Sequence, residues 1–274
     1  MSRRYLLYLP VGEALFSPWI FHPNRKYDVA INFYSTQPDE SFAHKAEYVF
    51  FTRGGKWPAI YKNLASIRRQ YQSYAFFDED VHLSVESLNR CFSAGDHLKI
   101  DLFQASLSQR SIGFHKELFY QEQSSKFFRP TNLVEIMMPI FSQKFLSEVA
   151  HTFPESESGY GLDYVWASKK PRMGVINAYQ AEHLRSVRSV FWRNSRGESA
   201  HQEMVRILKK YDLPVQWKHQ AYYFLRQNLI KFQQQRKSSL WAWLETPQAG
   251  MKIKKAQSKA STSSRLVHQA QSLS

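Results

Sequence analysis

The stretch Tyr74-Ala75-Phe76-Phe77-Asp78-Glu79-Asp80 joins an apolar, aromatic run to three consecutive carboxylates. Its aromatic residues are typical of a buried strand. Three neighbouring carboxylates repel one another, so ionising all of them is costly unless a cation lies among them. Mg²⁺ and Mn²⁺ prefer oxygen ligands and often bind one or two carboxylates together with substrate phosphates. Because open α/β sheets bind ligands outside the carboxyl ends of their strands, the stretch indicates a cation site there. The alternative is a helix cap or a turn.

Length and composition indicate a globular protein. The chain has 274 residues, of which 43% are hydrophobic and 15% aromatic, and this predicts one large domain, alone or with appendages. The longest apolar run, Ile136–Phe141, is far below the roughly 20 residues that a membrane-spanning helix needs. Pro10 and Gly12 interrupt the N-terminal apolar run before a secretory leader could form. The single cysteine, Cys91, excludes an internal disulfide and a cysteine-based zinc site, which favours a reducing cytoplasm.

The net charge of +14 is concentrated near the C-terminus. Residues 201–274 carry 13 Lys and Arg against three acids, or +10, so the other 24 basic and 20 acidic residues leave +4 for the rest. This asymmetry predicts a balanced binding or catalytic domain over residues 1–199 and a basic helical extension over residues 200–249. Residues 250–274 are rich in Ser, Gln and Lys, and we expect them to be a disordered basic tail.

Strand-like and helix-like runs alternate through the first two-thirds of the chain. The expected strands are Tyr5–Pro10, Tyr27–Tyr34, Glu47–Thr52, Tyr74–Phe77, Leu98–Leu107, the Leu133–Phe141 region and Met173–Ala178. The expected helices are Trp57–Tyr71, a helix capped by Ser84 that ends near Gly95, Ser142–His151, Glu203–Lys210 and Gln216–Gln235. Because crossover helices favour parallel pairing, the alternation predicts an α/β fold with a mixed sheet flanked by helices.

Two further segments could contact a phosphate or a metal. In Arg53-Gly54-Gly55-Lys56-Trp57, backbone amides and the lysine between a strand and a helix could approach a phosphate. The alternative is an ordinary turn with a solvated lysine. His183 follows the last expected strand of this region, and an isolated histidine is more often structural than a ligand. It becomes a candidate ligand if it meets the acidic triplet in space.

Two more segments hold carboxylates in unusual surroundings. Glu135 lies within a very apolar run, so it is expected either to form a structural ion pair or to line a pocket. In Ser158–Trp166, two glycines flank Tyr160 and Asp163 follows. The aromatic face could stack on a sugar ring, and the carboxylate could act as a general base. The alternative is a glycine-rich turn in which Asp163 caps the next helix.

The order of these motifs resembles a known family. The series is Tyr8–Glu13, Gly54–Trp57, Phe76–Asp80, Leu133–Ser142, Ser158–Tyr164 and Glu182-His183. Over roughly residues 5–190 it resembles a family of plant and bacterial glycosyltransferase-like proteins of the GT-A type, with an Asp-x-Asp motif. The resemblance implies a Rossmann-like α/β domain that binds a nucleoside-diphosphate sugar through Mn²⁺ or Mg²⁺.

The resemblance also implies roles for individual residues. The metal ligands would be Asp78, Asp80 and His183, the catalytic base would be Asp163, and Tyr160 would contact the acceptor. Our own hypothesis adds nucleotide-sugar contacts at Asp28, Gly55, Lys56 and Glu79 and an acceptor contact at Glu135. Tyr160 stands where the family usually has Trp, and Tyr164 where a further acid often occurs. We therefore expect a metal-dependent, inverting glycosyltransferase that acts on a hydroxyl of a glycan, a lipid-linked or a lipopolysaccharide-type acceptor.

The basic C-terminus has a separate expected role. The helix Gln216–Gln235 interleaves aromatic and basic residues, so it could pack on the domain or lie on an anionic membrane surface. The matching location is the cytoplasm, with the protein peripheral to the inner face of the membrane. Two rival functions stay open: a catalytically silent protein that binds a nucleotide sugar or a glycan, and a basic protein that binds nucleic acid. No RNA-binding motif is present, so nucleic acid is the less favoured partner.

Overall fold

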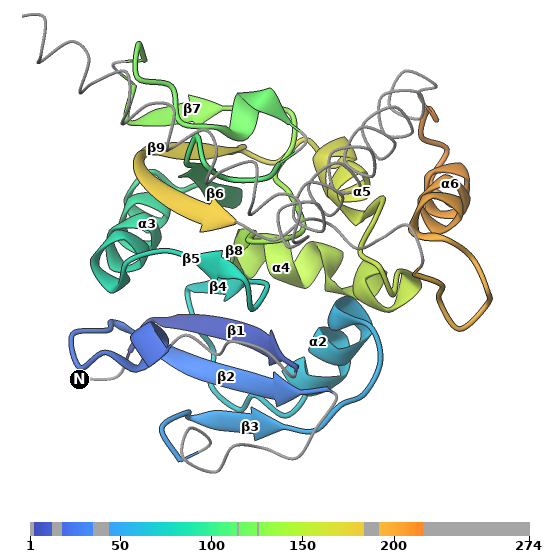
Figure 1. Ribbon diagram of the computed structural model, residues 1–274, viewed down its shortest axis with the longest axis horizontal. Helices are drawn as coiled ribbons and strands as arrows, with labels where there is room; N and C mark the ends of the chain where they lie inside the picture. Colours follow the sequence, from blue (N-terminus) through green and yellow to red (C-terminus); the bar gives the residue numbers. More distant parts are fainter. Residues whose placement is uncertain are drawn as a thin grey trace, which may run out of the picture. The chain divides into compact units, whose positions relative to one another are not determined.

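The computed structural model describes residues 3–12, 18–34, 44–113, 115–124, 126–183 and 192–215. Nine strands in these residues form one mixed sheet, in the order β3-β2-β1-β4-β8-β6-β9-β5, with β7 paired to β9 (Figure 1). The strands are β1 (Tyr5–Val11), β2 (Tyr27–Phe33), β3 (Tyr48–Phe50), β4 (Ser73–Phe76), β5 (Val81–His82), β6 (Leu102–Leu107), β7 (Phe128–Pro130), β8 (Ile140–Ser142) and β9 (Met173–His183). The helices are η1 (Pro18–Phe21), α2 (Lys56–Leu64), α3 (Val85–His97), η2 (Lys116–Leu118), α4 (Gln143–Val149), η3 (Ala150–Glu155), α5 (Leu162–Ser168) and α6 (Ala200–Lys210).

One half of the sheet is parallel and the other is mixed. The strands β3, β2, β1 and β4 run parallel, so their carboxyl ends meet at one edge. The strand β8 is antiparallel to both β4 and β6, and β9 is parallel to β6. The short strands β5 and β7 pair with β9 in the antiparallel sense. The predicted α/β fold with a mixed sheet flanked by helices is confirmed.

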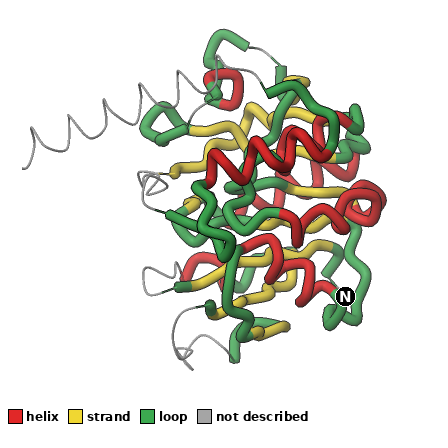
Figure 2. The backbone as a smooth tube through the Cα atoms, turned by 90° about the vertical axis from the view of Figure 1, so that its right-hand side faces the viewer, coloured by secondary structure: helices red, strands yellow, loops and turns green. Residues whose placement is uncertain are grey.

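Both faces of the sheet are buried, as the apolar strand β1 requires. Its side chains alternate: Leu7 and Leu9 join the apolar cluster under α3, while Leu6 and Tyr8 join the cluster under α2, α4 and α5. In the second cluster the rings of Trp57, Phe153 and Trp166 pack edge to face, with centroids 4.7–5.7 Å apart. Figure 2 shows helices lying in front of the strands in that view. The sheet is therefore packed between two apolar clusters, one on each face.

Several boundaries differ from the predicted ones. The helix expected over Trp57–Tyr71 ends at Leu64, because the amides of Ser66 and Ile67 bond to carbonyls three residues back and tighten the last turn. The strand expected over Leu98–Leu107 begins only at Leu102, since α3 continues to His97 and Lys99 has a left-handed φ of 50°.

The Leu133–Phe141 region is regular strand only from Ile140, where β8 begins. Before it, the carbonyls of Met137 and Pro139 still accept from the amides of Asp78 and Phe76. The last expected strand of this region, Met173–Ala178, continues as β9 to His183. The helix expected over Ser142–His151 is shorter: Ser142 caps α4, which ends at Val149 and is followed by η3.

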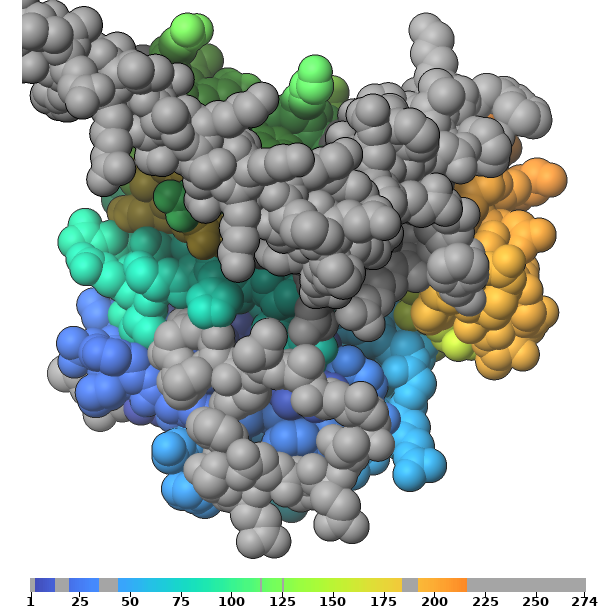
Figure 3. Space-filling view, viewed as in Figure 1, coloured from blue at the N-terminus to red at the C-terminus, as the bar shows by residue number. Residues whose placement is uncertain are grey.

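The helix expected over Glu203–Lys210 is present as α6 and begins three residues earlier, at Ala200. Ser199 and Gln202 form a capping box there, in which each side chain accepts from the other's backbone amide. Figure 3 shows α6 in orange at the surface. The expected helix Gln216–Gln235 and the tail 250–274 lie outside the described residues. Within the described part of the chain, no helix is long and apolar enough to cross a membrane.

Candidate functional site

The acidic triplet lies at the carboxyl edge of the parallel strands. Beyond β4, the amide of Phe77 donates to the carbonyl of Tyr8 at 3.1 Å, and the amide of Asp78 donates to that of Met137 at 2.8 Å. The backbone of β4 thus continues between β1 and the Met137 segment for two more residues. This places Asp78 and the residues after it where an open α/β sheet binds ligands.

Strand pairing brings His183 to Asp80. The strand β9 leaves the register of β6 after the pair Ala105–Ile176 and resumes it at Ser106–Gln180. It then pairs with β5, so that Val81 faces His183. Nε2 of His183 lies 3.5 Å from Oδ2 of Asp80. His183 therefore meets the acidic triplet in space, which is the condition that makes it a candidate metal ligand.

Hydrogen bonding fixes which nitrogen of His183 faces Asp80. Nδ1 of His183 lies 2.8 Å from the carbonyl oxygen of Ile112, which can only accept, so Nδ1 carries a hydrogen. In the neutral ring, Nε2 then holds the lone pair and points it at Asp80. Burial lowers the pKa of His183, but Asp80, the Ile112 carbonyl and Asp78 outweigh it and raise the pKa to about 9. A proton and a cation would therefore compete for the same nitrogen.

Asp78 is paired with Lys56 in the structure. Nζ of Lys56 lies 2.6 Å from Oδ1 of Asp78, 2.8 Å from the carbonyl oxygen of Ile136 and 3.0 Å from that of Phe76. Burial lowers the pKa of Lys56 and raises that of Asp78, while the attraction within the pair opposes both shifts. An ammonium group has three donors, and all three point at protein oxygens. Lys56 thus ties the end of β4 to the Ile136 segment, and its contact with the nucleotide sugar remains a prediction.

Glu79 links the ends of β1 and β2. Its carboxylate accepts from the amide of Gly12 at 2.7 Å and from the hydroxyl of Tyr34 at 3.3 Å. A Cβ atom on Gly12 would lie 2.3 Å from that hydroxyl, so a larger residue would displace the Tyr34 ring. Glu79 lies at the carboxyl edge, and its nucleotide contact remains a prediction. The sequence analysis did not single out Tyr34 as its partner.

Asp28 lies at the opposite end of the sheet. It pairs in register with Leu6, five residues before Val11, which corresponds to about 16 Å along the strand. Its buried carboxylate accepts from Arg3 at 3.2 Å, Arg69 at 3.0 Å and the Tyr71 hydroxyl at 2.7 Å. This carboxylate therefore neutralises two arginines far from the acidic triplet, and the nucleoside contact of Asp28 remains a prediction.

Close packing explains the glycine at position 55. Gly55 is the N-cap of α2 with an ordinary φ of −66°. A Cβ atom there would lie 2.4–2.9 Å from the backbone of Glu157, so a larger residue would displace that segment. The predicted phosphate contact of Gly55 remains a prediction.

Asp163 lies in the first turn of α5 and is buried. The N-cap of α5 is Gly161 with φ of 92°, so the alternative in which Asp163 caps the helix is wrong. Burial raises the pKa of Asp163 to about 7, although backbone amides, including that of Tyr164 at 3.0 Å from Oδ1, oppose the shift. A carboxyl group that titrates near neutral pH is suited to general-base chemistry.

Glu135 lies near the same segment. It is buried, and its amide donates to Oε1 of Gln104 at 2.8 Å. Burial raises the pKa of Tyr164, and the carboxylates of Asp163, Glu117 and Glu135 raise it further, so these groups lie within electrostatic reach of one another. Tyr160 is half-buried, between the two left-handed glycines. The acceptor contacts of Glu135 and Tyr160 remain predictions.

The described residues contain no group of three or more His, Cys, Asp or Glu placed to hold a metal ion. Asp78 faces Lys56, and Asp80 and His183 form a pair. The sequence analysis also missed Glu203, whose buried carboxylate binds the backbone of residues 157–158. Its spacing from Ala200 and Ile207, three and four residues away, was the available signal, since it puts Glu203 on the buried face of α6.

No protein-family model matches the chain, and no curated protein matches it in sequence. Solved structures do resemble its fold. GalNAc-T7, solved with UDP, GalNAc and Mn²⁺, is 10% identical with a TM-score of 0.55, over 80% of this chain and 50% of that one. Residues 1–349 of S. aureus TarS, solved with UDP, are 15% identical with a TM-score of 0.49, over 65% of this chain and 59% of that one.

The comparison with GalNAc-T7 establishes the fold. The chain has a GT-A-like architecture, a mixed sheet flanked by helices, as the sequence analysis predicted. The chain spans only half the length of GalNAc-T7 and about three fifths of the TarS fragment. At 10% identity, GalNAc-T7 is informative about the path of the backbone and not about the residues of the site.

Proposed function

We propose that this chain is a metal-dependent glycosyltransferase that moves a sugar from a nucleoside-diphosphate sugar to a hydroxyl of an acceptor, with inversion. One observation carries the proposal: in a GT-A-like fold, Asp80 and His183 meet at the carboxyl edge of the parallel strands, 3.5 Å apart. They come from positions 103 residues apart in sequence, so long-range strand pairing, and not chain proximity, brings them together.

The residues fit a divalent cation. Nε2 of His183 is the ring nitrogen that can hold a lone pair, and it faces a carboxylate oxygen of Asp80. A nitrogen and an oxygen from the protein are enough for Mn²⁺ or Mg²⁺ when substrate phosphates and water supply the other ligands. Asp78 would be a third ligand through Oδ2, since its Oδ1 accepts from Lys56. The bound cation would stabilise negative charge on the departing diphosphate.

Asp163 would be the catalytic base. As the acceptor oxygen forms its bond to the anomeric carbon, the bond from that carbon to the diphosphate breaks, and Asp163 takes the proton of the hydroxyl. Its pKa of about 7 supports this role, because a base that titrates near the working pH combines a useful ionised fraction with adequate basicity. Tyr160 would stack on the acceptor, Glu135 would line its pocket, and Glu79 and Gly55 would contact the nucleotide sugar.

The acceptor and the location belong to the same proposal. A glycan, a lipid-linked or a lipopolysaccharide-type acceptor would suit a cytoplasmic enzyme held at the inner face of the membrane by its basic C-terminus, at about 1 kcal/mol per basic residue near anionic lipid. Liposome flotation would compare the full chain with a version that ends at Gly250. Equal recovery of the two would remove the membrane part of the proposal.

Calorimetric titration tests the donor and the metal. The wild-type protein and Asp80→Asn would be titrated with a panel of UDP-, GDP- and CMP-sugars and nucleoside diphosphates, with Mn²⁺ and with a chelator. We expect binding of one nucleotide that needs the metal and is lost in the variant. Absence of nucleotide binding under every condition would overturn the proposal and direct attention to the basic C-terminus and nucleic acid.

The contact between Lys56 and Asp78 favours a second candidate, a catalytically silent protein that binds a nucleotide sugar or a glycan. An internal ammonium that occupies one carboxylate of the Asp-x-Asp pair leaves fewer ligands for a metal. This candidate predicts donor binding without transfer to any acceptor or to water. Measuring nucleotide release in the same samples separates the two candidates.

A further inference from the structure

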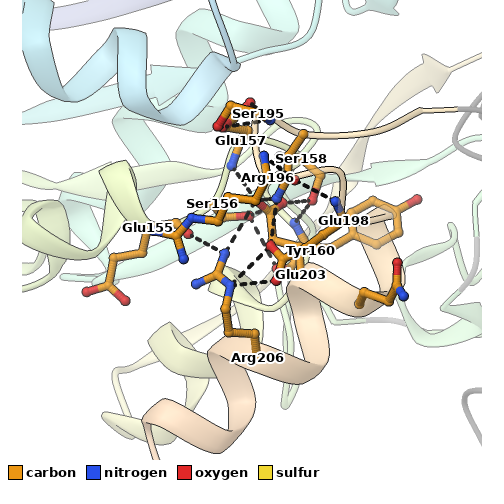
Figure 4. Close-up of polar contacts among 12 residues, drawn as sticks. Glu155, Ser156, Glu157, Ser158, Tyr160, Ser195, Arg196, Glu198, Glu203 and Arg206 are labelled. Carbon is orange, nitrogen blue, oxygen red and sulfur yellow. Dashed lines mark hydrogen bonds and ion pairs between the residues drawn. The ribbon is translucent and has the colours of Figure 1, made fainter.

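Glu203 of α6 lies at the centre of a cluster of polar residues around segment 155–161 (Figure 4). Its side chain is 1% exposed. It accepts from the amides of Glu157 at 3.0 Å and Ser158 at 2.9 Å, and from the hydroxyls of Ser156 at 3.0 Å and Ser158. The side-chain amide of Asn194 adds a further bond at 3.1 Å.

The charge of Glu203 is well stabilised despite its burial. Burial alone raises the pKa of Glu203, but the bonds from Ser158, Asn194 and the Glu157 amide outweigh it, so the pKa lies below its usual value. Arg206, with its NH2 nitrogen 3.6 Å away, adds a positive charge. Hydrogen bonds to an ionised acceptor are roughly twice as strong as those between neutral groups. The segment therefore has a strong, directional anchor.

The anchored segment leads directly into Tyr160 and Asp163. Two of its residues, Gly159 and Gly161, have left-handed φ values of 84° and 92°, and glycine alone adopts these freely. The amide of Gly159 donates to the hydroxyl of Ser156, which itself donates to Glu203. On the other side, the backbone of Glu157 packs against Gly55. The path of this stretch is thus set by contacts outside it, and Glu203 supplies four of the hydrogen bonds, all to Ser156, Glu157 and Ser158.

We infer that Glu203 is a positioning residue for the transfer reaction: it holds segment 156–161 so that Tyr160 and Asp163 face the acceptor. The inference rests on the proposed function and extends the active unit to α6, beyond the boundary at residue 199 that the charge pattern suggested. A reactive group displaced by about 1 Å can lose 10²-fold in rate, so a loosened anchor would affect turnover without contacting substrate.

The test compares Glu203→Gln with Glu198→Gln. Gln has one acceptor oxygen where Glu203 has two, so the donors of Ser156, Glu157 and Ser158 cannot all be satisfied. Glu198 belongs to the same cluster and accepts from Asn194 and Arg206, and within the described part of the chain no hydrogen bond joins it to residues 156–158. Nucleotide release and transfer to octyl glycosides would be measured with Mn²⁺. The maximal rate would be divided by the number of donor-binding sites found by calorimetry, which gives kcat per donor-binding site.

We expect kcat per donor-binding site to fall 10-fold or more in Glu203→Gln, with donor affinity within about 3-fold of wild type, and Glu198→Gln to stay near wild type. Glu203→Asp, which keeps the charge, should recover part of the loss. A merely structural role would lower the number of donor-binding sites and leave kcat per site unchanged, which would overturn the inference. An equal loss in Glu198→Gln would overturn it too.

Hydrogen exchange separates this inference from the proposed function. The amides of Glu157 and Ser158 should exchange faster in Glu203→Gln than in Glu198→Gln, whether or not any sugar is transferred. Unchanged exchange at both amides would show that Glu203 does not hold the segment. If the anchor is confirmed and the wild-type protein transfers no sugar, the proposed function fails, and the catalytic part of this inference fails with it.

Discussion

The ammonium group of Lys56 lies 2.6 Å from the carboxylate of Asp78, and the same group bonds the backbone carbonyls of Phe76 and Ile136. One side chain at the start of α2 therefore holds the first acid of the triplet, the end of β4 at Phe76 and the neighbouring segment at Ile136.

Replacing Lys56 by Met should lower the free energy of unfolding by about 2–4 kcal/mol, since it leaves one carboxylate and two carbonyls without this donor. Donor affinity per folded molecule should change by less than about 3-fold, on the order of 0.6 kcal/mol. Urea unfolding and calorimetry check the two parts. Lys62→Met, an exposed position on the same helix, is the control and should be nearly neutral. A large loss of donor affinity with full stability would instead support Lys56 as a nucleotide contact.

Activity should follow the ionisation of Asp163. A base must be deprotonated, so kcat/KM for the acceptor, at saturating donor and metal, should rise with pH and level off above about 7. Asp163→Asn should lower kcat by about 10²-fold or more and leave donor affinity near wild type. Initial rates between pH 5.5 and 9 provide the measurement. A flat profile, or full turnover in Asp163→Asn, would assign the base elsewhere.

The same carboxyl group should cost the protein stability at alkaline pH. Its pKa is raised in the folded state to about 7, so the folded protein holds a proton that the unfolded chain releases near pH 4, and stability is lost as the pH rises through 7. Asp163→Asn should therefore be more stable than wild type at pH 8, by up to about 4 kcal/mol, with the difference shrinking toward pH 4. Thermal unfolding at a series of pH values checks this.

Three glycines separate backbone strain from steric conflict. Gly54 has φ of 108° and open space around it. Gly55 has an ordinary φ, but a Cβ atom on it would meet the backbone of Glu157. Gly159 has φ of 84°, and a Cβ atom on it would lie 2.5 Å from Nε1 of Trp57. Gly54→Ala should cost about 1–2 kcal/mol, from strain alone. Gly55→Ala should also cost about 1–3 kcal/mol but disturb segment 157–161. Gly159→Ala, which combines both effects, should cost the most. Urea unfolding ranks the three, and an equal cost for all would contradict this assignment.

The main strands and the position of the acidic triplet at a strand end could be expected from the sequence, because aromatic and β-branched runs such as Tyr27–Phe33 are typical of strands. The sequence also indicates at which end of a strand a polar residue lies. Asp28 is the second residue of β2, so the sequence places it at the end opposite the one where the acidic triplet follows β4. The partners of Lys56 could not be expected, since the carbonyl of Ile136 is 80 residues away and carries no signal in the sequence.

The pairing of His183 with Asp80 shows the same limit. The spacing of β9 alone does not reveal the irregular register with β6 or the antiparallel contact with β5. The anchor at Glu203 was missed for a different reason. The basic composition of residues 201–274 masked one acidic residue on the apolar face of α6. Local periodicity was therefore the better guide to that helix than regional charge.

Residues 177–179 are the three residues by which β9 departs from the register of β6. They act as a spacer, and their number is as constrained as the identity of any side chain. Successive side chains of a strand point to opposite faces, so losing one residue here would turn position 183 away from Asp80 without altering the histidine. Losing two would restore the face but bring a different residue to Val81. A related chain could thus keep both Asp80 and His183 and still lose the contact between them through an insertion or deletion in residues 177–179. An alignment of motifs alone would not reveal this loss.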